Sequence, residues 1–153
     1  MSNETAIMLQ DLDSIRKFCY QTILDIIGDY IYREQRYATH FSVAIIYSKT
    51  PLNIHTQELE KTLRKTDNLI CITDNIVCIV FDAVQTHSYV KASENLYRTL
   101  KSIEYHQHYF IATSFSDDFN KNYLDMINHL FDRLHYSVEH NCQNSVNYED
   151  YII

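Results

Sequence analysis

Arg64 and Asp67, three residues apart near the middle of the chain, have side chains with complementary chemistry. An arginine guanidinium can hold a phosphate or a guanine base through two hydrogen bonds, and a carboxylate can accept from guanine N–H groups. The same pair at this spacing can instead form an ion pair or a cap at the end of a helix, which is the interpretation we prefer. The pair is therefore a candidate ligand site with a structural alternative.

Other chemistries are excluded by residue counts. Gly28 and Pro51 are the only glycine and the only proline, so the glycine-rich phosphate loops of P-loop and Rossmann proteins are absent. The cysteines form no C-x-x-C pair, which argues against a zinc ribbon and a disulfide framework. We expect no metal site and no cofactor, and we interpret the cysteines as small buried side chains: Cys19, Cys71, Cys78 and Cys142.

Length and charge restrict the class of protein. The chain has 153 residues, of which 46% are hydrophobic, and this is typical of one compact domain. The net charge of −7 argues against a nucleic-acid partner, which would require a basic surface. No apolar run is long enough to span a membrane, and the first ten residues do not resemble a secretory signal. We expect a cytoplasmic protein without a membrane contact.

The first forty residues have the apolar periodicity of a long helix, in which Gly28 marks a kink or a boundary. A helix of this length cannot bury its whole apolar stripe against one small core. We therefore expect part of it to contact a second copy of the chain in a homodimer.

The remaining pattern alternates strands with helices. Runs of apolar residues predict strands at 41–48, 69–72, 76–81 and 109–115, and a short final strand near 145–148. Helical spacing predicts helices at 56–65, 88–103 and 122–140. If Asp74 and Asn75 form a two-residue turn, Cys71 and Cys78 lie opposite each other, whereas a shift of one residue separates them. This order predicts an α/β (α+β) fold of ferredoxin-like type, with a β-α-β-β-α-β core and helices packed on one sheet.

Several strings in this order resemble the GGDEF domain of bacterial diguanylate cyclases, which has a nucleotidyl-cyclase-type sheet. The likeness covers roughly residues 30 to 150 and divides the chain into an N-terminal helical segment, 1–29, and a GGDEF-like domain, 30–153. Its strings are Leu63-Arg64-Lys65-Thr66-Asp67 and, after five residues, Thr73-Asp74-Asn75-Ile76-Val77; Arg36-Tyr37 before the first strand; Thr113-Ser114-Phe115-Ser116; and Asp132, Tyr136, Asn144 and Val146.

The departures from the family pattern concern its catalytic chemistry. The family condenses two GTP molecules with metal ions that require carboxylate ligands. Tyr47 or Ser48 stands where the resemblance implies a metal-binding aspartate, and Glu139 where it implies a phosphate-binding lysine. The degenerate signature has Thr73 and Asp74 for two glycines and Asn75 and Ile76 for two acids; Cys142 and Gln143 replace a further glycine and arginine.

The resemblance and its departures together predict a catalytically inactive, degenerate GGDEF-like domain that acts in bacterial signalling through an unidentified protein partner. In active relatives, the R-x-x-D pair that Arg64 and Asp67 match forms an inhibitory site for cyclic di-GMP, and Arg98 is a candidate third ligand. The first alternative is therefore a receptor for cyclic di-GMP or a nucleotide at these residues. The second is an enzyme with altered chemistry on the same fold.

Overall fold

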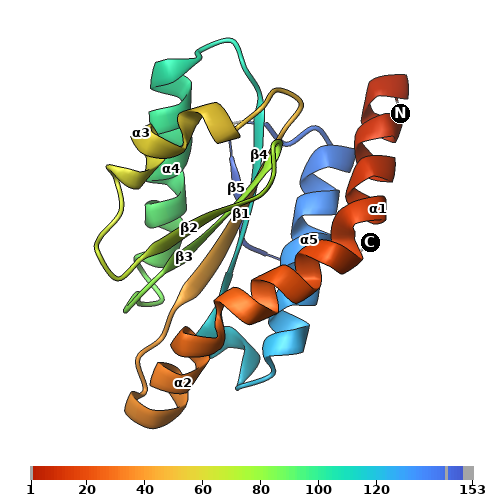
Figure 1. Cartoon of the computed structure of the whole chain (residues 1–153). Helices are drawn as coiled ribbons and strands as arrows, with labels where there is room; N and C mark the ends of the chain where they lie inside the picture. The colour runs from red at the N-terminus through yellow and green to blue at the C-terminus, as the bar shows by residue number, and fades with distance from the viewer. Residues whose placement is uncertain (1, 144, 150–153) are drawn as a thin grey trace.

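The computed structural model describes residues 2–143 and 145–149, so Asn144 and the end of the predicted domain, 150–153, lie outside the described residues. Helices and strands follow one another in nearly the predicted order (Figure 1). The helices are α1 (Asn3–Ile26), α2 (Gly28–Tyr37), α3 (Thr56–Glu60), α4 (Tyr89–Ile103) and α5 (Tyr123–Glu139), with 3-10 turns η1 (Asn53–His55) and η2 (Ser116–Phe119). The strands are β1 (Ser42–Ser48), β2 (Asn68–Thr73), β3 (Ile76–Phe81), β4 (Tyr109–Phe115) and β5 (Val146–Asn147).

The five strands form one sheet in the order β2-β3-β1-β4-β5. Strand β1 is central and antiparallel to both β3 and β4, while β5 is added parallel to β4 at one edge. The first four strands in this order are those of a ferredoxin-like β-α-β-β-α-β core. The predicted fold class is therefore confirmed.

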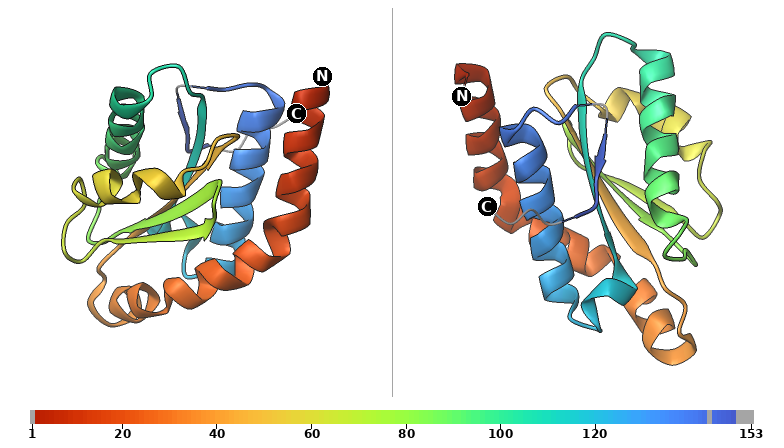
Figure 2. Two further views of the ribbon diagram at one scale, coloured as in Figure 1. Left: turned by 45° about the horizontal axis from the view of Figure 1, so that its top comes forward. Right: turned by 180° about the vertical axis from the view of Figure 1, so that it is seen from behind.

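Helices cover both faces of the sheet (Figure 2). Alternate residues of β1 point to opposite faces because the side-chain period of a strand is two. Val43 and Ile45 belong to the core beneath α1 and α5, whereas Ala44 and Ile46 belong to the core beneath α3 and α4. All seven residues of β1 are buried, as expected for a central strand covered on both sides.

The N-terminal segment is two helices that meet at Ile27 and Gly28. Helix α1 packs along α5, and Arg16 of α1 forms an ion pair with Asp132 at 2.8 Å. Part of the apolar stripe is left uncovered by the chain's own core, as expected, since Ile7 and Phe18 are 60% and 62% exposed; its contact with a second copy stays a prediction. Five other apolar residues along the stripe are buried in the chain's own core: Met8, Leu9, Leu12, Cys19 and Ile23.

The β2–β3 hairpin has the two-residue turn, but its register differs from the simplest prediction. Thr73 lies opposite Ile76, whereas Cys71 lies opposite Val77 because the register shifts between Cys71 and Thr73. This bulge inserts one extra residue and separates Cys71 from Cys78. All four cysteines are free, and the prediction that they are buried is wrong for exposed Cys71 and half-buried Cys142.

The predicted helix 56–65 is shorter than expected. Helix α3 ends at Glu60, after which Thr62 N–H and Leu63 N–H bond to carbonyls three residues back. The Thr62 hydroxyl also donates to the Leu59 carbonyl at 2.7 Å. These bonds use the carbonyls that a longer helix would need and turn the chain toward β2.

Candidate functional site

The turn of the β2–β3 hairpin lies against the end of β1. Its Asn75 side chain donates to the carbonyls of Ser48 and Lys49 at 3.0 and 2.9 Å, and Asn75 O accepts from Ser48 N–H at 3.1 Å. Asp74 O accepts from Leu52 N–H at 2.6 Å and from Asn53 N–H. The turn is therefore held to the segment after β1 by its own backbone and amide groups.

Of the positions that the resemblance assigns to carboxylates, Tyr47, Ser48 and Ile76 are buried beside this turn, and Asn75 is half-buried. Ile76 lies opposite Tyr47 in the β1–β3 ladder, and both belong to the core beneath α1. Tyr47 is 5% exposed, and its pKa is raised, first by burial and then by the charge of Asp11. Within residues 2–143 and 145–149, no three His, Cys, Asp or Glu side chains are grouped as a metal site.

Helix α1 and this turn enclose a hollow of about 580 Å³, which we call the α1 hollow. One wall is a stripe of α1, and the other is the end of β1 with the hairpin turn. Lys49 forms an ion pair with Glu4 across it. The residues that line the α1 hollow are Glu4, Ile7, Met8, Asp11, Ile15, Tyr47, Lys49, Thr73 and Asn75.

A second hollow of about 560 Å³ shares Glu4, Met8 and Lys49 with the first and continues to the end of α5. Glu139 and Gln143, two of the degenerate positions, line it. Carboxylates therefore border the region in which the resemblance would require a cation to hold phosphate, and the lysine there is paired with one of them.

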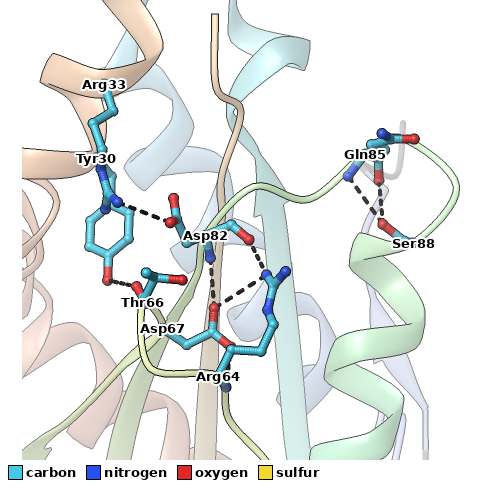
Figure 3. A network of polar contacts seen from close by, with 8 residues as sticks. All are labelled: Tyr30, Arg33, Arg64, Thr66, Asp67, Asp82, Gln85 and Ser88. Carbon is cyan, nitrogen blue, oxygen red and sulfur yellow. Dashed lines mark hydrogen bonds and ion pairs between the residues drawn. The ribbon is translucent and has the colours of Figure 1, made fainter. Parts of the chain in front are cut away.

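Arg64 and Asp67 form a compact turn directly before β2 (Figure 3). Asp67 accepts from Arg64 N–H through Oδ2 and from Asp82 N–H through Oδ1, both at 2.8 Å. The Arg64 guanidinium lies 3.4 Å from Asp67 and also donates to the Asp82 carbonyl. The two residues contact each other, as their spacing predicted. Their contacts are the ion pair and the backbone cap of the structural alternative.

Sequence reasoning missed the neighbours of this turn, which come from α2 and from the end of β3. Arg33 forms an ion pair with Asp82 at 2.9 Å, and the Tyr30 hydroxyl donates to the Thr66 carbonyl at 2.8 Å (Figure 3). Burial raises the pKa of Tyr30. The sequence does show Asp82 as a carboxylate directly after an apolar strand. It does not show that the ion-pair partner of Asp82 is Arg33, on a distant helix.

Arg98 is exposed on α4, where its guanidinium donates to Asn95 at 3.4 Å. A shallow hollow of about 330 Å³ lies beside the Arg64 turn, and Arg98 is not among the residues that line it. That hollow is bordered by Glu60, Leu63, Arg64, Lys65, Asp67, Asn68 and Leu69.

A buried polar network around Glu34 was also missed. The Tyr123 hydroxyl donates to Glu34 Oε1 at 2.7 Å, the Ser116 hydroxyl donates to Oε2, and His40 Nδ1 lies 3.0 Å from the same oxygen. The pKa of Tyr123 is raised by burial and by its bond to the Glu34 carboxylate. The network ties α2 to η2 and α5, so its role is structural.

No family model matches the sequence, and no curated protein matches it. The fold, however, is similar to solved structures of GGDEF domains. A DGC protein from Thermotoga maritima is 15% identical with a TM-score of 0.60, over 72% of this chain and 89% of that chain. The GGDEF domain of DgcB from Caulobacter crescentus, in complex with c-di-GMP, is 6% identical with a TM-score of 0.66, over 84% of this chain and 88% of that chain.

The diguanylate cyclase SiaD from Pseudomonas aeruginosa, in complex with its activator SiaC, is 8% identical with a TM-score of 0.59. The likeness covers 84% of this chain and 57% of that chain. These comparisons establish that the chain has the fold of a GGDEF domain, as the resemblance implied. None of the helices in the described part of the chain has the length and apolar composition of a membrane span.

Proposed function

We propose that this chain is a catalytically inactive GGDEF-fold domain that acts in bacterial signalling, in the cytoplasm, through protein contacts. The observation that carries the proposal is the hairpin turn, where Asn75 is hydrogen-bonded to the chain's own carbonyls and Ile76 is buried. Metal-dependent condensation of GTP requires carboxylates at such a place, because Mg²⁺ takes hard oxygen ligands. The Asn75 amide already bonds two carbonyls, and the Ile76 side chain is aliphatic. Neither residue therefore supplies a carboxylate ligand.

Charge supports the same conclusion. Glu4, Asp11 and Glu139 border the two adjoining hollows, whereas Lys49 is engaged by Glu4. A triphosphate would meet an unfavourable field in such a region, and restoring a favourable one would require more than one substitution.

The test is turnover of GTP by the purified full-length chain with Mg²⁺ or Mn²⁺. We expect no cyclic di-GMP and no GTP consumption above the protein-free blank, because no three His, Cys, Asp or Glu side chains among the described residues are grouped to hold a metal ion. Chromatography of the nucleotides after prolonged incubation measures both, with an active diguanylate cyclase as the positive control. Metal-dependent consumption of GTP would contradict inactivity, and a product other than cyclic di-GMP would revive the alternative of altered chemistry.

Binding of cyclic di-GMP at Arg64 and Asp67, with Arg98 as a third ligand, is the second candidate function. It is supported by the Arg64 side chain, which is 56% exposed beside a hollow. It is weakened by Asp67, which is 3% exposed and already accepts from Arg64 N–H and Asp82 N–H. A guanine would have to compete with these bonds, and the freed backbone groups would be left unpaired.

Calorimetric titration with cyclic di-GMP separates the two functions. The proposal of protein contacts expects no heat of binding at a dissociation constant in the tens of micromolar. Binding in that range that is lost in Arg64→Ala and kept in Lys61→Ala, an exposed position outside the hollow, would establish the receptor function instead.

The proposed protein contacts include a homodimer formed through α1. Phe18 is exposed on this helix and does not border the α1 hollow, and SiaD, which has the same fold, was solved in complex with an activator protein. We expect light scattering at about 100 μM to detect dimers. Phe18→Lys should yield monomers, because a lysine at an apolar interface would lose its hydration. A wild-type monomer at that concentration would contradict this part of the proposal.

A further inference from the structure

The α1 hollow has an apolar wall that the chain's own side chains do not cover. Ile7 is 60% exposed and borders the hollow, and Met8 and Ile15 lie beside it on the same helix. The volume of about 580 Å³ is within the range of small-molecule sites. An apolar body placed against this wall would remove it from water, which is favourable.

The opposite wall contains a tyrosine hydroxyl that has no protein partner. Tyr47 is 5% exposed and borders the hollow, and within residues 2–143 and 145–149 no group hydrogen-bonds its hydroxyl. This hydroxyl is therefore free to hydrogen-bond a polar group of a bound molecule.

The charge of the hollow indicates which polar group fits. Glu4 is neutralised by Lys49, whereas the carboxylate of Asp11 has no cationic partner in the described part of the chain. Asp11 is close enough to Tyr47 for its charge to raise the pKa of the phenol, which stays neutral and can accept a hydrogen bond. A carboxylate and a neutral hydroxyl oxygen together accept from an ammonium group, whereas they would repel a phosphate or a carboxylate.

We propose that the α1 hollow binds an organic cation with an apolar, ring-sized body. Its ammonium group donates to Asp11 and to the Tyr47 hydroxyl oxygen, and its body packs against Ile7 and Met8. The inference does not depend on the proposed function, because it concerns neither nucleotide turnover nor a protein partner. It assigns to this hollow a ligand of the opposite charge to a nucleoside triphosphate.

Tryptamine is a suitable probe because the chain contains no tryptophan, so indole fluorescence reports only the added molecule. We expect its fluorescence anisotropy to rise with protein concentration, with a dissociation constant on the order of 0.1 mM for a ligand of this size. Indole-3-propionate has the same ring and a negative charge, and it should bind at least about tenfold more weakly because Asp11 repels it. Raised salt should weaken tryptamine binding.

Variants of the full-length chain locate the site. Asp11→Asn should weaken tryptamine about tenfold because it removes the negative charge, and Tyr47→Phe about threefold because it removes the hydroxyl acceptor. Asp25→Asn, an exposed position on the same helix outside the hollow, should bind like the wild type. Circular dichroism should show each variant folded, as expected for changes that leave the apolar core intact. No binding near 1 mM, equal binding of the propionate, or an unaffected Asp11→Asn variant would overturn the proposal.

Discussion

Replacing Glu34 by alanine is expected to lower the free energy of unfolding by about 3 to 4 kcal/mol. The carboxylate is buried and accepts from the hydroxyls of Tyr123 and Ser116 and contacts His40. Truncation leaves the Tyr123 and Ser116 hydroxyls without this acceptor and creates a cavity at the same time. In a chain of this size the midpoint of thermal unfolding should fall by roughly 10 °C.

Denaturant and thermal unfolding followed by circular dichroism measure this loss. Glu94→Ala, on the exposed face of α4, is the matched control and should change the free energy of unfolding by less than about 0.5 kcal/mol. Tyr123→Phe removes one of the donors and should cost about 1 kcal/mol alone. It should cost less in a chain that already has Glu34→Ala, since the bond is then absent. A Glu34→Ala variant as stable as the control would mean that the network is not formed.

The Glu34 network also marks the limit of sequence reasoning on the fold. Apolar periodicity predicted the strands and helices because burial selects for it directly. A glutamate on an amphipathic helix is normally predicted to be exposed. Glu34 is buried only because η2 and α5 pack against α2. The extra residue in β2 was unpredictable for a similar reason: turn residues fix the turn, not the register of the strands beyond it.

The candidate site was predictable only in part. The sequence placed Thr73, Asp74 and Asn75 in a turn at a strand end, and it paired Arg64 with Asp67, because both inferences need only local spacing. The hydrogen bonds of Asn75 to the end of β1 depend on how two distant segments dock. The wall that α1 contributes to the α1 hollow depends on the direction in which that helix leaves Gly28, and spacing along one helix does not encode it.

Removing the N-terminal helix is expected to abolish cooperative folding of residues 30–153. The predicted division at residue 29 treats that helix as a separate segment, yet its buried apolar side chains share one core with the sheet and α5. Four of these side chains, Met8, Leu9, Leu12 and Ile23, are each worth about 1.5 to 3 kcal/mol. Together they contribute roughly as much as the whole stability of a typical domain, about 5 to 15 kcal/mol. The truncated chain would also expose the matching face of α5 to water.

Calorimetry and NMR of the truncated chain measure the effect. Two point variants test whether the buried side chains of α1, rather than its exposed ones, provide the stability. Ile23→Ala removes a fully buried side chain of α1 and should cost about 2 to 5 kcal/mol. Lys17→Ala changes an exposed side chain on the same helix and should cost less than about 0.5 kcal/mol. If residues 30–153 alone gave a sharp thermal transition and dispersed amide signals, the helix would be an appendage and the division at residue 29 a true domain boundary. Because the same helix walls the α1 hollow, a folded truncated chain that still bound tryptamine would also contradict the site assigned to that ligand.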